Sequence, residues 1–444
     1  MAPAAPGRRD WGELAEGFLR QNGDALARLD VRVTVEPGRR GTRLLLHPGA
    51  RVGAVPLRSP ETGHVESGFV IRPRFGWAGM GRVLAQTGWQ AMPDMLPLPQ
   101  VPGSGREVPP WVVAGPAIRR LRDLLAGQRR GYRMAEETLG RVRGRVDWNR
   151  YGVASLPAGA WDRFPCRYPD LGRDPRLRAE VRWALERLRG ALLRQAGADA
   201  LACRLAEQAH ALLETVGDVP AARPAGGVPA AGGRLDPVLQ EGMEALGWIA
   251  DERGLGGAAD LHGIAWAEAL DGLWERFVEG SVRRWAASVG GVVSTGRERT
   301  AAVPLRWHAR GVPSLGHLAP DAVVRCGRRV VLFDAKYKAH LAHGGVDGWR
   351  AFTEAERTVH RADVHQALAY AALFDAAVVT AVLVYPLPGA DWQQVADRGR
   401  AVLLADVGTG GRAVRLALAG LPFGWAGGGP ETERMWHVLL AGGA

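Results

Sequence analysis

Apolar residues in the first part of the chain fall in short runs that Gly and Pro separate. Runs of this length, bounded by turn-forming residues, are typical of β-strands. The predicted strands are Val31–Val35, Thr42–Leu46, Arg51–Leu57 and Gly68–Ile71. A Pro-rich stretch at 93–110 is expected to be loop, so residues 1–110 are expected to form a β-rich N-terminal domain.

After this region the apolar residues take a helical spacing. Residues 111–216 are therefore expected to form a helical middle region, in which the arginine-rich stretch 117–133 is either a solvated helix face or a surface for DNA or a partner. Residues 217–240 are rich in Pro, Ala and Gly and are expected to be a linker. Residues 241–444 are then expected to form the last domain.

One stretch of the last domain has the spacing of a buried helix. Its core-facing residues are expected to be Leu270, Trp274, Phe277, Val278, Ser281 and Trp285. Glu275 and Glu279 lie one turn apart on the flank of this helix. Because Glu279 and Arg283 are four positions apart, an ordinary ion pair between them is the simplest expectation. Further along, residues 361–377 are expected to be a helix and 341–358 an irregular insert.

Two short apolar runs, Ala322–Val324 and Val330–Phe333, flank the dipeptide Gly327-Arg328. Gly at the first central position favours a two-residue hairpin turn between antiparallel strands. In the register that this turn sets, Asp321 lies opposite Asp334, with Cβ atoms about 4.5–5.5 Å apart. Two carboxylates held so closely repel each other, so one is protonated or both share a cation.

Lys336 follows Asp334 by two positions, so its side chain is predicted to point to the same face of the strand. The chain has two lysines, Lys336 and Lys338, among 57 basic residues. Lysine differs from arginine in being a compact charge whose pKa shifts when it is buried. An oxygen-rich site with few protein ligands suits Mg²⁺, whereas a pair of exposed aspartates at strand ends is the alternative interpretation.

Composition narrows the possible partners and the cellular location. A net charge of +11 favours an anionic partner, nucleic acid first, although a general preference for arginine accounts for part of it. The N-terminus has no apolar signal segment, and no run of 18 apolar residues predicts a membrane span. Three cysteines without metal-ligand spacing suit a reducing cytoplasm. No phosphate-binding loop of the Gly-x4-Gly-Lys-Ser/Thr kind occurs in the sequence.

Three motifs in order resemble a known family. Pro320-Asp321, a hairpin and Asp334-Ala335-Lys336 resemble the signature of the PD-(D/E)XK nucleases. The segment 363–372 resembles the Gln-x-x-x-Tyr helix of one branch of these enzymes, and 382–386 resembles their next core strand. The ordered set is most similar to the McrC family, the nuclease subunits of modification-dependent restriction systems.

The resemblance implies an α/β (α+β) fold, with a restriction-endonuclease-like domain at 241–444 whose mixed sheet is flanked by helices. It also implies hydrolysis of DNA phosphodiester bonds with Mg²⁺, for which Mn²⁺ can substitute. The implied catalytic residues are Asp321, Asp334, Lys336, Gln366, Tyr370 and Glu275. The implied metal ligands are Asp321, Asp334, the Ala335 carbonyl and, through water, Glu275.

The resemblance further implies a hexameric AAA+ partner of the McrB type, a GTPase or ATPase that recognises and translocates DNA. The N-terminal half would dock on that motor, which fits the missing phosphate-binding loop. Two other functions stay open at this point: a catalytically degenerate DNA-binding or adaptor subunit, and a stand-alone repair nuclease. The sequence does not indicate the recognised modification, the cut pattern or the stoichiometry.

Overall fold

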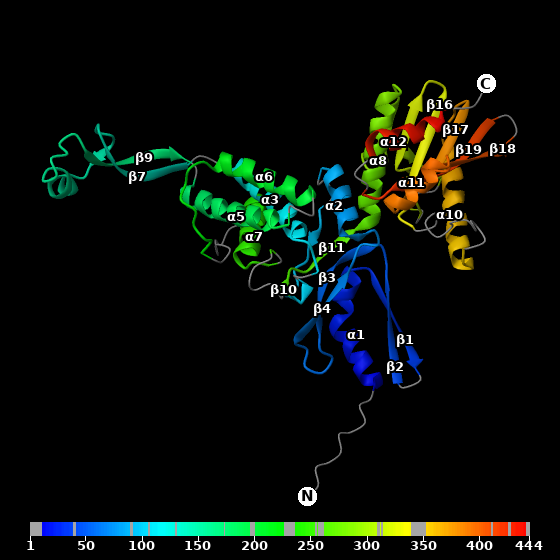
Figure 1. Cartoon of the computed structure of the whole chain (residues 1–444), viewed down its shortest axis with the longest axis horizontal. Helices are drawn as coiled ribbons and strands as arrows, with labels where there is room; N and C mark the ends of the chain where they lie inside the picture. The colour runs from blue at the N-terminus through cyan, green and yellow to red at the C-terminus, as the bar shows by residue number, and fades with distance from the viewer. Residues whose placement is uncertain are drawn as a thin grey trace, which may run out of the picture. The chain divides into compact units, whose positions relative to one another are not determined.

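The structure is a computed structural model that describes residues 11–38, 41–88, 92–104, 107–128, 131–172, 174–195, 200–225, 236–253, 255, 262–308, 311, 314–338, 352–409, 412–424 and 428–440. The chain has the expected α+β fold (Figure 1). It divides into two compact units. The first combines Met1–Ser104 with Ile264–Ala444, and the second is Gly105–Gly263.

The N-terminal segment of the first unit contains all four predicted strands, together with two helices that the strand pattern did not indicate. Its elements are α1 (Trp11–Arg28), β1 (Val31–Gly38), β2 (Gly41–Pro48), β3 (Arg51–Arg58), β4 (Val65–Ile71), α2 (Gly76–Gln86), β5 (Asp94–Met95) and β6 (Val101–Pro102). Leu26 of α1 and Leu29, the residue after the helix, are fully buried in a small core with Val55 of β3, which fixes the helix on the sheet.

The sheet of the N-terminal segment also includes a strand from the C-terminal segment. The strand order is β4-β3-β11-β5, and β11 (Trp266–Ala269) comes from the C-terminal segment. Trp266 pairs with Ala54 on one side and with Met95 on the other, so β11 is an interior strand. The expected boundaries at 110 and 241 therefore differ from the compact units, since residues distant in the chain share one sheet.

The C-terminal segment is built on a six-stranded mixed sheet with the order β12-β15-β16-β17-β19-β18. Strands β16, β17 and β19 run parallel, whereas β12 and β18 are antiparallel to their neighbours. The strands are β12 (Val292–Thr295), β15 (Ala322–Cys326), β16 (Arg329–Ala335), β17 (Val378–Leu387), β18 (Val402–Thr409) and β19 (Arg412–Pro422). A separate short pair is β13 (Val303–Pro304) and β14 (His317–Leu318).

Helices cover both faces of this sheet (Figure 1). The helices are α8 (Leu270–Ser288), α10 (Glu354–Ala371), α11 (Gly389–Asp397), α12 (Gly428–Trp436) and the 3-10 turn His437–Leu439. On one face, Trp285 of α8 and Trp436 of α12 pack edge-on against Phe333 of β16. On the other face, Ala367 and Ala371 of α10 lie in a core with alternate residues of the strands. All six residues predicted to face the core from α8 are buried.

An aromatic cluster joins the N-terminal segment to the six-stranded sheet within the first unit. Phe75, just before α2, stacks on Phe423 with ring centroids 4.8 Å apart and meets Tyr337 edge-on at 6.0 Å. Arg82 of α2 donates a hydrogen bond to the carbonyl of Gly424. The N-terminal strands are therefore part of the same folded unit as the sheet that carries Asp321 and Asp334.

The second unit packs four helices, α3 (Trp111–Gly127), α5 (Pro175–Leu193), α6 (Ala200–Val216) and α7 (Pro237–Ala250). Helix α7 begins inside the stretch expected to be a linker, with Asp236 as its N-cap and Pro237 in its first turn. Residues 218–225 of that stretch are irregular, and 226–235 lie outside the described residues. The two-residue strand β10 (His262–Gly263) ends the unit.

The helical expectation fails for residues 131–172, which form a three-stranded sheet in the order β7-β9-β8. Its elements are β7 (Gly131–Leu139), β8 (Arg145–Val146), the short helix α4 (Trp148–Arg150), the π-turn Tyr151–Ser155 and β9 (Phe164–Gly172). The apolar side of this sheet is a small separate core of Val146, Cys166 and Tyr168. Cross-strand pairing over nine positions between β7 and β9 outweighs the helix-favouring composition of the segment.

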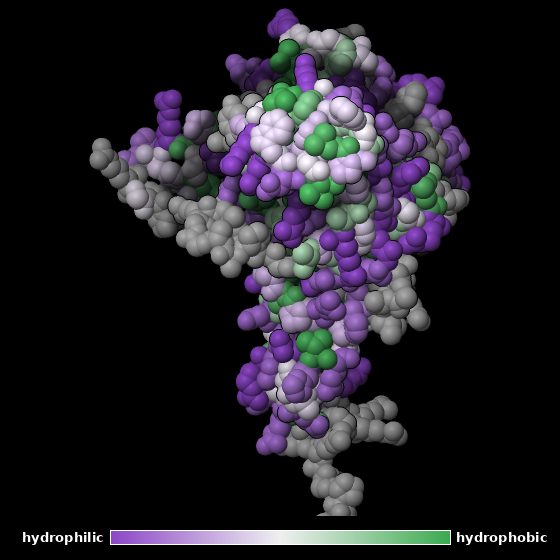
Figure 2. Space-filling model, turned by 90° about the vertical axis from the view of Figure 1, so that its left-hand side faces the viewer, coloured by the Kyte–Doolittle hydropathy of each residue, from purple (hydrophilic) through white to green (hydrophobic). Residues whose placement is uncertain are grey.

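The end of this hairpin is unusually apolar for a surface. Trp148 is 64% exposed, Val153 80% and Trp161 71%. Figure 2 views the protein from the left-hand side of Figure 1, and pale and green side chains interrupt the hydrophilic surface in that view. Within the described part of the chain, no helix combines the length and hydrophobicity that crossing a membrane requires.

Candidate active site

The hairpin between β15 and β16 has the predicted register. Cys326 pairs with Arg329 and Ala322 with Phe333, so the next position along places Asp321 opposite Asp334. Gly327 in the turn has a φ of 57°, a backbone conformation that favours glycine. Both aspartates therefore point to the face of the sheet that packs against α10.

Asp321 and Asp334 are held differently. One Asp321 oxygen, Oδ2, accepts a hydrogen bond of 2.7 Å from the backbone N–H of Ala335. Asp334 is 3% exposed and accepts a 3.0 Å hydrogen bond on Oδ1 from Lys336 Nζ. Its Oδ2 is buried and accepts no hydrogen bond from a described residue, although Lys336 Nζ lies 2.8 Å away.

Lys336 connects this strand to helix α10. Besides Asp334, its ammonium donates a 2.9 Å hydrogen bond to Gln366 Oε1. The amide of Gln366 then donates to the hydroxyl of Tyr370, also at 2.9 Å. Sequence-distant residues that the resemblance assigns to one site thus form a continuous chain of hydrogen bonds from Asp334 to Tyr370.

Glu275 reaches the site from α8. Its side chain is exposed, and burial of part of its surface, followed by the charges of Asp271 and Asp334, raises its pKa. Asp334 contributes to that shift because its carboxylate lies close enough to repel Glu275. The structure therefore places Glu275 within electrostatic range of the aspartates without a direct bond to them.

Burial and mutual repulsion govern the charge of the aspartate pair. Burial, followed by the charges of Asp334 and Glu275, raises the pKa of Asp321 to about 7. Burial also raises the pKa of Asp334, although the Lys336 ammonium opposes that shift. Desolvation lowers the pKa of Lys336, but its pairing with Asp334 outweighs that effect and raises it. Two acidic groups and one ammonium thus share a poorly solvated space.

These donors suit a hard divalent cation. The available atoms are carboxylate and carbonyl oxygens, which Mg²⁺ prefers, and Asp334 offers a buried oxygen without a hydrogen bond. Among the described residues, no group of three or more His, Cys, Asp and Glu side chains is close enough to hold a metal on its own. A Mg²⁺ ion here would therefore depend on the two aspartates, the Ala335 carbonyl and water.

Four residues near the site were not identified from the sequence as functional. Lys338 Nζ contacts both carboxylate oxygens of Asp363, at 2.6 and 2.7 Å. The same carboxylate bonds to the hydroxyl of Tyr385, which lies 3.0 Å from Nδ1 of His360. Burial, and next the charge of Asp363, raises the pKa of Tyr385, so its hydroxyl stays protonated and able to donate.

Two features of the sequence could have identified this second network. Lys338 is the only lysine besides Lys336, and Asp363 precedes Gln366 by three positions on one face of α10. The helix itself runs from Glu354 to Ala371, so it begins earlier and ends earlier than expected, and 354–358 is not an irregular insert. Residues 341–351 of that insert lie outside the described residues.

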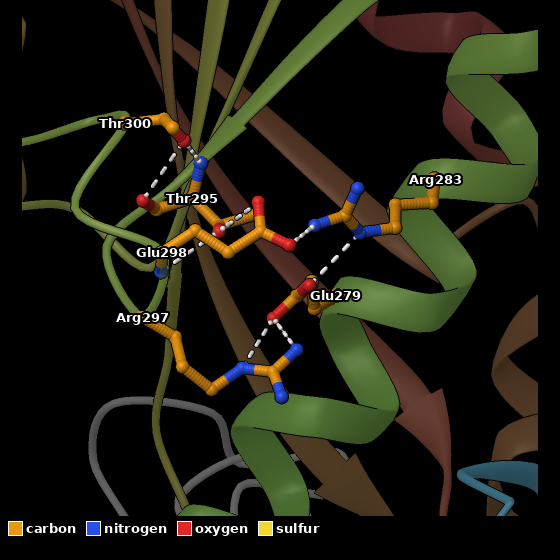
Figure 3. A network of polar contacts seen from close by, with 6 residues as sticks. All are labelled: Glu279, Arg283, Thr295, Arg297, Glu298 and Thr300. Carbon is orange, nitrogen blue, oxygen red and sulfur yellow. Dashed lines mark hydrogen bonds and ion pairs between the residues drawn. The ribbon is translucent and has the colours of Figure 1, made fainter.

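Glu279, the second glutamate on the flank of α8, forms ion pairs with arginines and so has a structural role (Figure 3). It is 6% exposed and accepts a 2.8 Å hydrogen bond from Arg283 Nε, the ion pair expected from the sequence. Arg297 donates to its other oxygen through Nε and Nη2, at 3.1 and 2.7 Å. Both oxygens are thus committed to arginines, which leaves Glu275 as the glutamate of α8 that faces the aspartates.

No protein-family model and no curated protein matches the sequence. Solved structures that are similar to it include two assemblies. One is a refined half-complex from the tetradecameric assembly of Thermococcus gammatolerans McrB AAA+ hexamers with bound McrC, at 13% identity and a TM-score of 0.38, covering 96% of this chain and 95% of that one. The other is the Thermococcus gammatolerans McrBC complex, at 12% identity and a TM-score of 0.24, covering 62% of this chain and 83% of that one. Both similar structures are McrB–McrC assemblies. They bear the name of the family that the sequence motifs resemble.

Proposed function

We propose that this protein is a Mg²⁺-dependent DNA endonuclease of the McrC kind. The observation that carries the proposal is the chain of hydrogen bonds through Lys336, which joins Asp334 to Gln366 beside a second, half-buried aspartate. The order of these residues along the chain is that of the PD-(D/E)XK signature. The net positive charge of the protein supports a nucleic-acid substrate.

Asp321, Asp334 and the Ala335 carbonyl would hold Mg²⁺, with Glu275 contacting it through water. When bound, Mg²⁺ polarises the phosphate and lowers the pKa of the attacking water. The ammonium of Lys336 orients that water and stabilises the negative charge that develops on the phosphate oxygens. Gln366 and Tyr370 position the phosphate, because their polar groups meet at the end of the same hydrogen-bond chain.

The test is cleavage of plasmid DNA by the full-length protein, with Mg²⁺, with Mn²⁺ and with EDTA. Asp334→Asn keeps the size of the side chain and removes the charge that a metal requires, so we expect cutting to fall at least about 1,000-fold. Circular dichroism checks that the variant is folded. Cutting by Asp334→Asn at the wild-type rate, or cutting in EDTA, would show that the site has been assigned wrongly.

We further propose a AAA+ GTPase or ATPase as partner, acting with this subunit on DNA in the cytoplasm, with the N-terminal half as the docking part. The resemblance to the McrC family motivates this, and the sequence contains no phosphate-binding loop of its own. The measurement is nucleotide hydrolysis by a purified AAA+ protein of the McrB type. Full-length protein and Asp334→Asn should stimulate hydrolysis equally, because docking and cutting use different residues. Absence of stimulation by either protein, with robust cutting of unmodified DNA, would instead indicate a stand-alone nuclease.

A further inference from the structure

A pocket of about 380 Å³ lies in the first unit, along α8, the helix that also carries Glu275. Charged side chains dominate its lining, from α8 and from the turn that follows β12. The charged residues are Arg276, Arg283, Arg284, Arg297, Glu279 and Glu298. We refer to this set as the arginine pocket.

The buried Glu279 and the exposed Glu298 hold two of these arginines in place (Figure 3). Glu279 lies between Arg283 and Arg297 and binds both. Glu298 accepts a 2.8 Å hydrogen bond from Arg283 Nη2 and a 3.1 Å hydrogen bond from Thr295. The guanidinium groups are therefore ordered before any ligand arrives, which lowers the entropy lost on binding.

Arg283 and Arg284 still have N–H donors that no described residue uses and that a ligand could bind. The bonds of Arg283 use Nε and Nη2, and Arg284 binds Glu433 through Nε at 3.2 Å. Among the described residues, no acceptor is bonded to Nη1 of Arg283 or to either terminal nitrogen of Arg284. A guanidinium carries five N–H donors, so several remain for an oxygen-rich anion.

The spare donors of the pocket suit an oxygen-rich anion. The bonds that Glu279, Glu298 and Glu433 make to Arg283 and Arg284 leave N–H groups of both arginines unused among the described residues. A DNA phosphodiester carries one negative charge and accepts hydrogen bonds from arginine in a two-pronged geometry.

The pocket adjoins the aspartate pair through two connections. Glu279 follows Glu275 by one helical turn, a rise of about 6 Å along α8. Gly296, next to Arg297, donates a backbone hydrogen bond of 3.0 Å to the carbonyl of Asp321. Because successive phosphates of one DNA strand are about 3.4 Å apart along the axis, a ligand in the pocket would lie within a few nucleotides of the aspartates.

We propose that the arginine pocket binds a phosphodiester of the DNA substrate close to the bond that is cut, and so sets the position of the strand in the active site. The proposal rests on the proposed nuclease function. It assigns Arg283 and Arg284 as direct phosphate ligands. Glu279 is a positioning residue that acts through the arginines.

The experiment measures DNA binding without cleavage. A fluorescein-labelled duplex of about 30 base pairs is titrated with full-length protein in Ca²⁺, at roughly 50 to 200 mM salt, and anisotropy gives the affinity. Arg284→Gln and Arg283→Gln should each weaken binding on the order of tenfold and lower the salt slope by about one. Arg398→Gln is the matched control, because Arg398 is an exposed arginine of the same unit, at the end of α11.

Wild-type affinity and salt slope in both pocket variants would overturn the proposal. An equal loss in Arg398→Gln would also overturn it, because only the total charge would then matter. Arg284→Gln leaves both arginines on Glu279, so it remains informative if Arg283→Gln proves unstable. The measurement needs no cutting, so a wild-type protein that binds DNA but does not cleave it would count against the proposed function alone.

Discussion

Lys336 makes two hydrogen bonds that require a compact ammonium. Its Nζ lies 3.0 Å from Asp334 Oδ1 and 2.9 Å from Gln366 Oε1, and the side chain is 15% exposed. A guanidinium is larger and planar, so it cannot donate to both acceptors from the same confined position. This explains why a chain that uses arginine almost everywhere has a lysine here.

We therefore expect Lys336→Arg to keep its charge and lose its function. Cutting of plasmid DNA should fall at least about 100-fold, because the water and the developing charge lose a correctly placed donor. Binding of DNA in Ca²⁺, measured by anisotropy, should change little, since the net charge is the same. Arg398→Lys on the surface serves as the control, and a Lys336→Arg protein as active as that control would contradict the assignment.

A second residue-scale prediction concerns Glu268, which lies on β11 and is 7% exposed. Burial, and next the charge of Asp94, raises its pKa from 4.5 to about 7. The folded state then holds the proton more tightly than the unfolded state. Stability should fall as the pH rises from about 4.5 to 7 and should level off above that range.

Glu268→Gln removes the loss of stability that ionisation of Glu268 causes at high pH, because the amide is neutral at every pH. At pH 8 the variant should be more stable by about 3 kcal/mol, and below pH 4.5 the two proteins should be equally stable. Urea unfolding at several pH values measures the difference. The exposed Glu61→Gln is the control, and a variant that is less stable than wild type at pH 8 would show that Glu268 is charged and paired.

At the scale of elements, the hairpin of β15 and β16 could be predicted to the residue, because a turn glycine and period-two alternation determine the register. Helix α10 could not be placed as well. Its capping box, Thr353 with Glu356, starts the helix at Glu354, seven residues before the start expected at 361. Its buried face includes Asp363, which an apolar pattern cannot reveal, because its burial depends on the ion pair with Lys338, a residue just after β16.

The ion pair between Lys338 and Asp363 ties α10 to the end of β16. Asp363 is 7% exposed on its side chain and Lys338 33%. We expect Lys338→Met to destabilise the protein by about 3 kcal/mol, because it leaves a buried carboxylate without its cation. Asp363→Leu should cost less, since the lysine can still reach water.

Thermal unfolding of the two single variants and the double variant tests this coupling. The double variant should recover part of the stability lost in Lys338→Met, because two apolar side chains replace a desolvated ion pair. Strictly additive losses would show that the two residues do not stabilise each other.

At the scale of the whole molecule, the first unit is discontinuous in the chain. No pattern in the sequence indicated this arrangement, because β11 is short and its partners β3 and β5 lie far upstream. Composition suggested boundaries at Pro- and Gly-rich stretches, whereas the compact units are set by long-range pairing. The N-terminal segment should therefore not be removable without loss of the fold around the aspartates.

A substitution at Gly424 tests whether the N-terminal segment and the six-stranded sheet stabilise each other. It has a φ of 69°, and a Cβ there would collide with the backbone of Gly79 in α2. Gly399 has a φ of 68° and nothing within 4 Å of the same position. Gly399→Ala should cost only the backbone strain, about 1 kcal/mol, whereas Gly424→Ala should cost roughly 1–3 kcal/mol more. Thermal unfolding compares them, and equal losses would mean that the contact with α2 contributes little to stability.

The interior position of β11 has a consequence for biosynthesis. Strands β3 and β4 leave the ribosome roughly 200 residues before β11, and at about 5–20 residues per second that delay lasts roughly 10–40 s. During this time the nascent chain presents an open sheet edge, while the second unit has its complete set of helices and can fold first. The sheet that bears Asp321 and Asp334 is finished later still. The proposed nuclease would thus be unable to cut the chromosome of the producing cell before its synthesis is complete.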